Sequence, residues 1–177
     1  ENIDDLFAIH KVVMETLKAD THSLQMLKGA EIQHSDLMFD FQQIDTEYEA
    51  YQYQKFDNLI NQLNRIKEYD YKYNYKSYLH PNIINLNNQE KLIKKDLIFL
   101  NNKKHNPKDF VTCHAPWSSV HINVDGNLFP CMAVSMGNVK TTKLSDIIFS
   151  NQFKKFKNII REKGTISGCN RCGWLKR

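Results

Sequence analysis

Four cysteines are the residues of this sequence best suited to metal or redox chemistry. Cys113 and Cys131 form a C-x17-C pair, and Cys169 and Cys172 form a C-x-x-C pair near residue 177. Two thiolates three residues apart can bind one metal centre. All four cysteines lie beyond residue 107, together with five of the six glycines and both tryptophans. The last third of the sequence is therefore where we expect a functional site.

Three kinds of site use cysteines in this number. Disulfides suit secreted domains that are too small to build a core, whereas 177 residues can bury a core without them. A structural zinc ion held by four thiolates is chemically sound, although zinc ribbons usually combine two C-x-x-C knuckles. An iron-sulfur cluster is also held by four thiolates. From the residues alone, zinc and iron-sulfur both stay open.

The segment between Cys113 and Cys131 predicts a β-hairpin that brings these two cysteines together. WSSVHINV and LFPC have the composition of two strands, the second of them ended by Pro130. Asp125-Gly126 between them predicts a two-residue type I′ turn, which needs positive φ at both positions.

Further along, Gly137-Asn138 predicts a turn, and helices are expected from Ser145 and over residues 151–163. Gly168 and Gly173 flank the second cysteine pair and would permit its close turns.

Other residues near the cysteines have ordinary explanations beside functional ones. His114 and His121 could replace a thiolate, but His121 lies among apolar neighbours, and we expect a packed or surface residue there. Trp117 and Trp174 could shield a metal centre from water or simply fill a core. No catalytic residue is assigned.

The first 110 residues contain weaker candidates. His10, His22 and His34 show no metal-ligand spacing along the sequence. Asp36, Asp40 and Asp45 in the long loop could face a substrate, and a solvated loop explains them equally well. Gln25, on the expected strand, is a weaker candidate.

The first 110 residues predict alternating helices and strands. A helix is expected over residues 3–18 with Asn2 as its N-cap, followed by the strand THSLQML. A loop over residues 31–47 would lead to a long amphipathic helix from Glu47 to about Lys67.

The tyrosine-rich stretch after this helix predicts an irregular or extended segment up to Pro81. A further helix of about three turns is expected within residues 87–104, with Leu92, Leu97 and Leu100 as candidates for its inward face. The change in composition after Asn106-Pro107 predicts a domain boundary at residues 107–112, which separates residues 1–110 from 111–177.

The order of motifs around the cysteines resembles a known family. Cys113 is followed by Trp117, Ile122, Asp125-Gly126 and Pro130-Cys131, then by Gly137-Asn138-Val139, by LSDIIFSNQF and by Cys169-x-x-Cys172-Gly. This pattern is similar to the C-terminal auxiliary-cluster module of radical S-adenosylmethionine enzymes, the SPASM domain or the shorter twitch domain. The SPASM form has seven cysteines and two clusters, so the four cysteines here are closer to a twitch domain with one cluster.

The resemblance implies a fold, a cofactor and a role. It implies an α+β chain in which the last units of a partial (β/α)6 barrel, residues 1–110, precede a hairpin-plus-helices domain, residues 111–177. Cys113, Cys131, Cys169 and Cys172 would all bind one auxiliary [4Fe-4S] cluster, which would relay electrons to or from a substrate radical. The relatives cleave S-adenosylmethionine with a second cluster held by C-x3-C-x2-C, and no such triplet occurs in this sequence. S-adenosylmethionine and that cluster are therefore expected only in a longer enzyme, an expectation that the start at Glu1 without a methionine also favours.

The partners and the location follow from the resemblance and from composition. Relatives imply a peptide or small-molecule substrate and an electron donor such as a flavodoxin or ferredoxin. The 24 basic and 20 acidic residues are interspersed, which argues against a nucleic-acid partner, and no apolar run is long enough to span a membrane. A cytoplasmic protein is expected. The alternatives are a zinc-stabilised, non-catalytic binding module and a degenerate relative that lost the radical chemistry.

Overall fold

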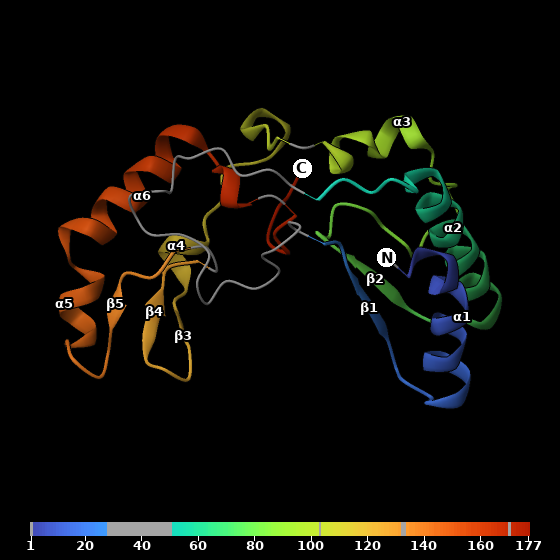
Figure 1. Cartoon of the computed structure of the whole chain (residues 1–177), viewed down its shortest axis with the longest axis horizontal. Helices are drawn as coiled ribbons and strands as arrows, with labels where there is room; N and C mark the ends of the chain where they lie inside the picture. Colours follow the sequence, from blue (N-terminus) through green and yellow to red (C-terminus); the bar gives the residue numbers. More distant parts are fainter. Residues whose placement is uncertain (1, 28–50, 103, 132–133, 170) are drawn as a thin grey trace. The chain divides into compact units, whose positions relative to one another are not determined.

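The structure is a computed structural model that describes residues 2–27, 51–102, 104–131, 134–169 and 171–177 (Figure 1). The described residues fall into two compact units. Unit 1 contains residues 2–26 and 51–102, and unit 2 contains residue 27 and residues 104–177. Mixed helices and small sheets make the chain consistent with the expected α+β class. The predicted loop over residues 31–47 lies outside the described residues.

Unit 1 is built from helices packed on a parallel strand pair. Its elements are η1 (Ile3–Asp5), α1 (Leu6–Lys11), the π-helical η2 (Val12–Thr16), β1 (His22–Gln25), α2 (Phe56–Tyr73), β2 (Ser77–His80), α3 (Lys94–Leu97) and η5 (Ile98–Asn101). Strands β1 and β2 pair in parallel, with His22 opposite Ser77 and Gln25 opposite His80. Because α2 lies between them in the chain, the three elements form a β-α-β arrangement (Figure 1).

The core of unit 1 lies between α2 and the other elements. Leu63 on α2, Leu79 on β2 and Leu86 after it are almost completely buried in one hydrophobic cluster. The expected inward residues Leu97 and Leu100 belong to this cluster, and Leu92 packs against it.

Two expectations for the N-terminal half are confirmed and one detail is wrong. The helix expected over residues 3–18 is present as three consecutive helical segments ending at Thr16, and the strand THSLQML appears as β1. Asn2 makes no side-chain capping hydrogen bond, so it does not cap this helix as expected.

The long helix is displaced toward the C-terminus from its predicted position. It begins at Phe56 and runs to Tyr73, so its last turns include tyrosines that were expected to be irregular. It ends where Asn74 adopts a left-handed conformation with φ of 56°. The buried face continues through Ile66 and Asp70, and this continued burial keeps the tyrosine-rich sequence helical.

The helix expected within residues 87–104 forms, but it is shorter than the three turns predicted. Only α3 and the 3-10 helix η5 form, from Lys94 to Asn101. The Leu92 amide donates to Asn64 Oδ1 at 2.8 Å, and Asn64 Nδ2 donates to the Leu92 carbonyl at 3.0 Å. These two bonds hold the backbone at Leu92 against α2, and Ile93 is extended, so the helix starts only after it.

Unit 2 combines a small antiparallel sheet with helices. Its elements are η6 (Pro107–Asp109), α4 (Ala115–Ser118), β3 (His121–Ile122), β4 (Asn127–Phe129), β5 (Gly137–Asn138), α5 (Leu144–Ile148), α6 (Asn151–Lys163) and η7 (Ser167–Cys169). The sheet order is β3-β4-β5, with both neighbouring pairs antiparallel. Helices α5 and α6 match the expected positions, and Ser150 caps α6 by accepting a hydrogen bond from the Phe153 amide at 3.1 Å.

The expected hairpin forms, but its loop has three residues and not two. The Asn123 amide donates to the Asn127 carbonyl at 3.0 Å, which leaves Val124, Asp125 and Gly126 in the loop. Gly126 has φ of +88°, whereas Asp125 is not among the positive-φ residues, so the type I′ prediction is wrong. The Asn123 side chain explains the difference, because its Oδ1 accepts from the amides of Asp125 and Asn127.

Two neighbouring expectations are also corrected. WSSVHINV is not one strand, because residues 115–118 form the short helix α4 around Pro116 and only residues 121–122 pair with β4. Gly137 and Asn138 are not a turn but the edge strand β5. A Cβ atom on Gly137 would lie 3.2 Å from the Ile147 side chain, so glycine lets this strand approach α5.

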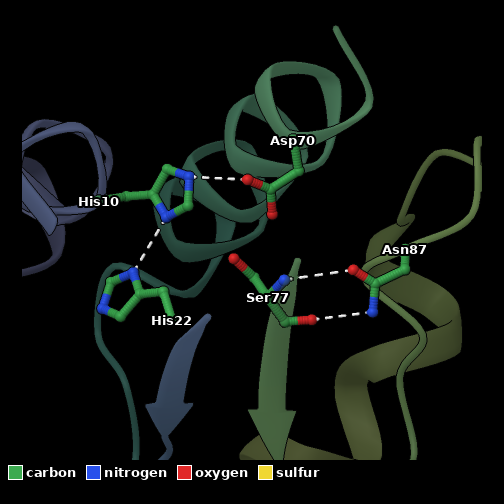
Figure 2. A network of polar contacts seen from close by, with 5 residues as sticks. All are labelled: His10, His22, Asp70, Ser77 and Asn87. Carbon is green, nitrogen blue, oxygen red and sulfur yellow. Dashed lines mark hydrogen bonds and ion pairs between the residues drawn. The ribbon is translucent and has the colours of Figure 1, made fainter. Parts of the chain in front are cut away.

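A buried polar network joins the helices of unit 1 to its strands (Figure 2). His10 Nε2 lies 2.9 Å from Asp70 Oδ1, at ion-pair distance but without the alignment of a hydrogen bond, and both side chains are at most 2% exposed. His10 Nδ1 lies 2.9 Å from His22 Nδ1. Asn87 exchanges two hydrogen bonds with the backbone of Ser77, at 3.2 and 3.0 Å. Burial and the neighbouring His10 lower the pKa of His22.

We expect replacement of Asp70 by alanine to destabilise unit 1 by about 3 kcal/mol, because it removes one partner of a buried polar pair. Asp57 on the same helix pairs with Lys94 at 2.8 Å in an exposed position, so Asp57→Ala is the matched control, with an expected loss below about 1 kcal/mol. Urea unfolding followed by circular dichroism measures both. Equal midpoints for the two variants would show that the network does not stabilise the fold.

Candidate metal centre

All four cysteines line one pocket in unit 2. None of them forms a disulfide. Cys113 precedes α4, Cys131 follows β4, and Cys169 and Cys172 come from the C-terminal knuckle. The C-x17-C pair and the C-x-x-C pair, distant in sequence, therefore share one site.

The backbone around Cys113 is fixed by the end of α6. The Cys113 amide donates to the Gly164 carbonyl at 3.0 Å, and the Val111 amide donates to the Lys176 carbonyl at 2.9 Å. Gly164 has φ of +79°, and a Cβ atom there would lie 3.4 Å from Thr112 Oγ1. These contacts place the segment that carries Cys113 beside both the helix end and the C-terminal tail.

The C-terminal knuckle is a series of tight turns. The Cys169 amide donates to the Ile166 carbonyl at 2.8 Å, and the Cys172 amide donates to the Cys169 carbonyl at 2.9 Å. The left-handed residue is Arg171, with φ of 53°, and neither Gly168 nor Gly173 is among the positive-φ residues. The Arg171 side chain is 1% exposed and donates to the Leu27 carbonyl within unit 2. The contact of the Arg171 side chain with the Leu27 carbonyl offers a reason for the left-handed backbone of Arg171. From the sequence, the tight turns were expected at Gly168 and Gly173 instead.

Burial dominates the electrostatics of the thiols. It raises the pKa of Cys169, which the other three cysteines raise further, and it raises the pKa of Cys113, with a smaller contribution from Cys172. Both thiols are therefore protonated at neutral pH in the absence of a cation. The Ile166 amide donates to Cys169 Sγ at 3.4 Å, a contact that favours the thiolate over the thiol.

The walls of the pocket are mostly apolar. Phe156 and Ile160 of α6 form one side, and Ala115 and Pro116 of α4 another. Such a surrounding limits access of water to a bound centre.

Four aromatic or histidine side chains considered as candidates from the sequence lie near the rim of the pocket or on the surface. His121 and Trp174 line the pocket and are exposed, Trp174 by 60%. His114 is exposed and does not line it. Trp117 is 40% exposed on α4.

Sequence reasoning missed a histidine that packs close to the knuckle. His105 Nε2 lies 2.7 Å from Thr165 Oγ1, and its ring stacks on Phe110 with centroids 4.9 Å apart. Burial lowers the pKa of His105 to about 4, against a smaller opposing effect of Asp109. The neutral imidazole thus holds Thr165, the residue before Ile166. His105 and Thr165 are 60 residues apart in the sequence, so no local sequence pattern could indicate their contact.

The remaining sequence candidates do not join this site. Gln25 is exposed at the end of β1, and His34, Asp36, Asp40 and Asp45 lie outside the described residues. Among the described residues, no three His, Cys, Asp or Glu side chains are grouped as they would be around a single metal ion. Of the helices in the described ranges, none is long and apolar enough to cross a membrane.

Comparison with known proteins gives one result for this site. Neither the curated proteins nor the solved structures include a match to this chain. A protein-family model does match, and its matched region begins at Cys113, the first of the four cysteines, and ends one residue after Cys172. Residues 113–173 therefore match the SPASM family, described as an iron-sulfur cluster-binding domain.

Proposed function

We propose that this chain is the C-terminal part of a radical S-adenosylmethionine enzyme and that residues 111–177 bind one auxiliary [4Fe-4S] cluster. One observation carries the proposal. Four thiols from three separate segments line a single apolar pocket, within the residues that match an iron-sulfur cluster-binding domain.

The residues of the pocket fit this cofactor. Four thiols are the donor set that such clusters use, and the described residues that line the pocket include no carboxylate. Cys113, Cys131, Cys169 and Cys172 would hold the irons, and the Ile166 amide would donate to the sulfur of Cys169. Phe156 and Ile160 would keep water from one side of the centre, which affects its reduction potential.

Unit 1 supports the proposed relation to a longer enzyme. Its parallel β1 and β2, with α2 between them in the chain, have the arrangement expected of late units in a (β/α) barrel. The C-x3-C-x2-C triplet that cleaves S-adenosylmethionine in relatives is absent from this sequence, so that step would belong to another part of the enzyme. The division into residues 1–110 and 111–177 stays part of this proposal.

With all four thiolates bound, no iron would be open to a substrate, so the cofactor would either carry electrons or hold the fold together. The proposed role is to carry electrons. The substrate would be a peptide or a small molecule in which a radical is formed. A flavodoxin or ferredoxin would exchange electrons with the enzyme.

Replacement of each of the four cysteines in turn by alanine tests the ligand set. We expect each variant, reconstituted with iron and sulfide without oxygen, to lose most of the visible absorption and to change the EPR spectrum of the reduced protein, because each removes one ligand. His121→Ala is the matched control at the pocket rim, and it should keep the iron content and spectrum of the unchanged protein. A cysteine variant with an unaltered spectrum would remove that cysteine from the ligand set.

Metal analysis separates this proposal from a zinc-stabilised module. We expect protein purified without oxygen to be brown and to contain about four iron and four acid-labile sulfide ions per chain. Iron, zinc and sulfide are measured on the same sample. A colourless protein with one zinc ion per chain and no labile sulfide would show that the domain is a zinc-binding module.

A further inference from the structure

Helix α6 has two faces with different properties. Three of its apolar residues, Phe153, Phe156 and Ile160, are at most 1% exposed, and the last two line the cysteine pocket. The same thirteen residues contain five basic side chains and one acidic side chain. The basic residues are Lys154, Lys155, Lys157, Arg161 and Lys163, and the acidic residue is Glu162.

Three of these cations form a row along the helix. Lys154, Lys157 and Arg161 have the spacing i, i+3 and i+7, which places them on one face. Each follows a buried residue by one position, so the row runs alongside the buried face. We call these three residues the basic stripe.

Contacts show that the basic stripe lies next to the pocket wall. The guanidinium carbon of Arg161 lies 5.8 Å from the centre of the Trp117 ring. Trp117 belongs to α4, whose residues Ala115 and Pro116 line the pocket. Lys157 lies over Phe153, with its ammonium 4.7 Å from the ring centre. The exposed ring of Trp117 thus lies beside the Arg161 end of the stripe, on the helix that supplies Ala115 and Pro116 to the pocket.

The basic stripe lacks the features of a membrane or nucleic-acid site. An amphipathic helix binds a membrane by inserting its apolar face, and the apolar face of α6 is already buried in the protein. Nucleic-acid sites usually interleave exposed aromatic residues with a broader basic surface. Three cations beside an exposed tryptophan, next to a pocket for a redox centre, fit a protein partner with an acidic surface.

We propose that the basic stripe, together with Trp117, is the docking surface for an acidic electron-carrier protein that exchanges one electron with the centre in the cysteine pocket. This inference rests on the proposed function, since it requires an iron-sulfur cluster there. A carrier docked on the stripe would be separated from the pocket by about the width of one helix, roughly 10 Å. Complementary charges would raise the association rate and make it dependent on salt.

The carrier and the cluster are the only electron donor and acceptor that the proposed exchange needs. In one direction a reduced carrier loses one electron and the cluster gains it, and in the other direction the cluster is oxidised and the carrier reduced. No bond forms or breaks, and no further oxidant or reductant is consumed.

The test uses the whole chain reconstituted with iron and sulfide, and a plant-type [2Fe-2S] ferredoxin as the acidic carrier. Stopped-flow absorbance measures the rate of electron exchange. The protein with the lower reduction potential is reduced before mixing, so that electron transfer to the other protein is spontaneous. We expect the rate to fall as salt is added, and the triple variant Lys154→Gln, Lys157→Gln, Arg161→Gln to be at least about tenfold slower at low salt. Lys154→Glu alone, at an exposed position, should slow the exchange in the same direction if the triple variant folds poorly.

The matched control removes the same charge elsewhere. Lys76, Lys108 and Lys143 are exposed, and their triple replacement by glutamine should leave the rate within about twofold of the unchanged chain. Equal rates for the stripe and control variants, or a rate independent of salt, would overturn the docking surface. The docking surface would also be wrong if the stripe variants lost binding to anionic lipid vesicles while their rate of electron exchange stayed unchanged.

Chemical reduction distinguishes this failure from failure of the proposed function. Dithionite is small and needs no docking surface, so it should bleach the cluster equally in all variants. If dithionite finds no reducible iron in the unchanged chain, the proposed function fails and the docking surface with it. If dithionite reduces every variant while the carrier does not distinguish them, only the docking surface is wrong.

Discussion

The structure of unit 2 depends on bringing four thiols from three separate segments to one apolar pocket. Without a cation the buried thiols of Cys113 and Cys169 stay protonated, because burial raises their pKa and opposes their ionisation. Backbone hydrogen bonds fix the segments that carry the cysteines independently of the sulfurs. The clearest is the bond from the Cys113 amide to Gly164, which ties the first cysteine to the end of α6. A bound centre would add its binding free energy to the same arrangement, so cofactor binding and folding of this unit are linked.

Helix α6 connects the pocket to the surface. The period of an α-helix places Phe156 and Ile160 on one side and the cations of the basic stripe on the adjacent side. One continuous element therefore supplies both a wall of the pocket and a charged surface. The Gly164 carbonyl that holds Cys113 directly follows this helix, so a change in the position of α6 would move the wall and one thiol together.

The sequence predicted features that depend on local patterns. The four cysteines, the returning strand before Cys131 and the amphipathic α6 carry strong signals of composition and spacing. Predictions failed where a distant or unexpected side chain controls the backbone. Asn123 changes the hairpin loop. Asn64 binds the backbone of Leu92, and α3 begins only after the extended Ile93. In the knuckle, Arg171 adopts the left-handed conformation, and its side chain donates to the Leu27 carbonyl. The positions of the glycines in the sequence could not predict this.

The contact between His10 and His22 was equally hidden, because the two residues come from a helix and a strand with no shared motif. Together with Asp70 and the nearby Ser77, these histidines include the residue types of a hydrolytic triad (Figure 2). Their surroundings argue for a structural role. His10 and Ser77 are fully buried and Asp70 is 2% exposed, which leaves no access for a substrate. His22 and Ser77 also begin their parallel strands, whereas ligands of parallel β/α folds bind at the opposite, carboxyl ends, where Gln25 and His80 lie. The network therefore joins α1 and α2 to the strands as part of the packing of unit 1.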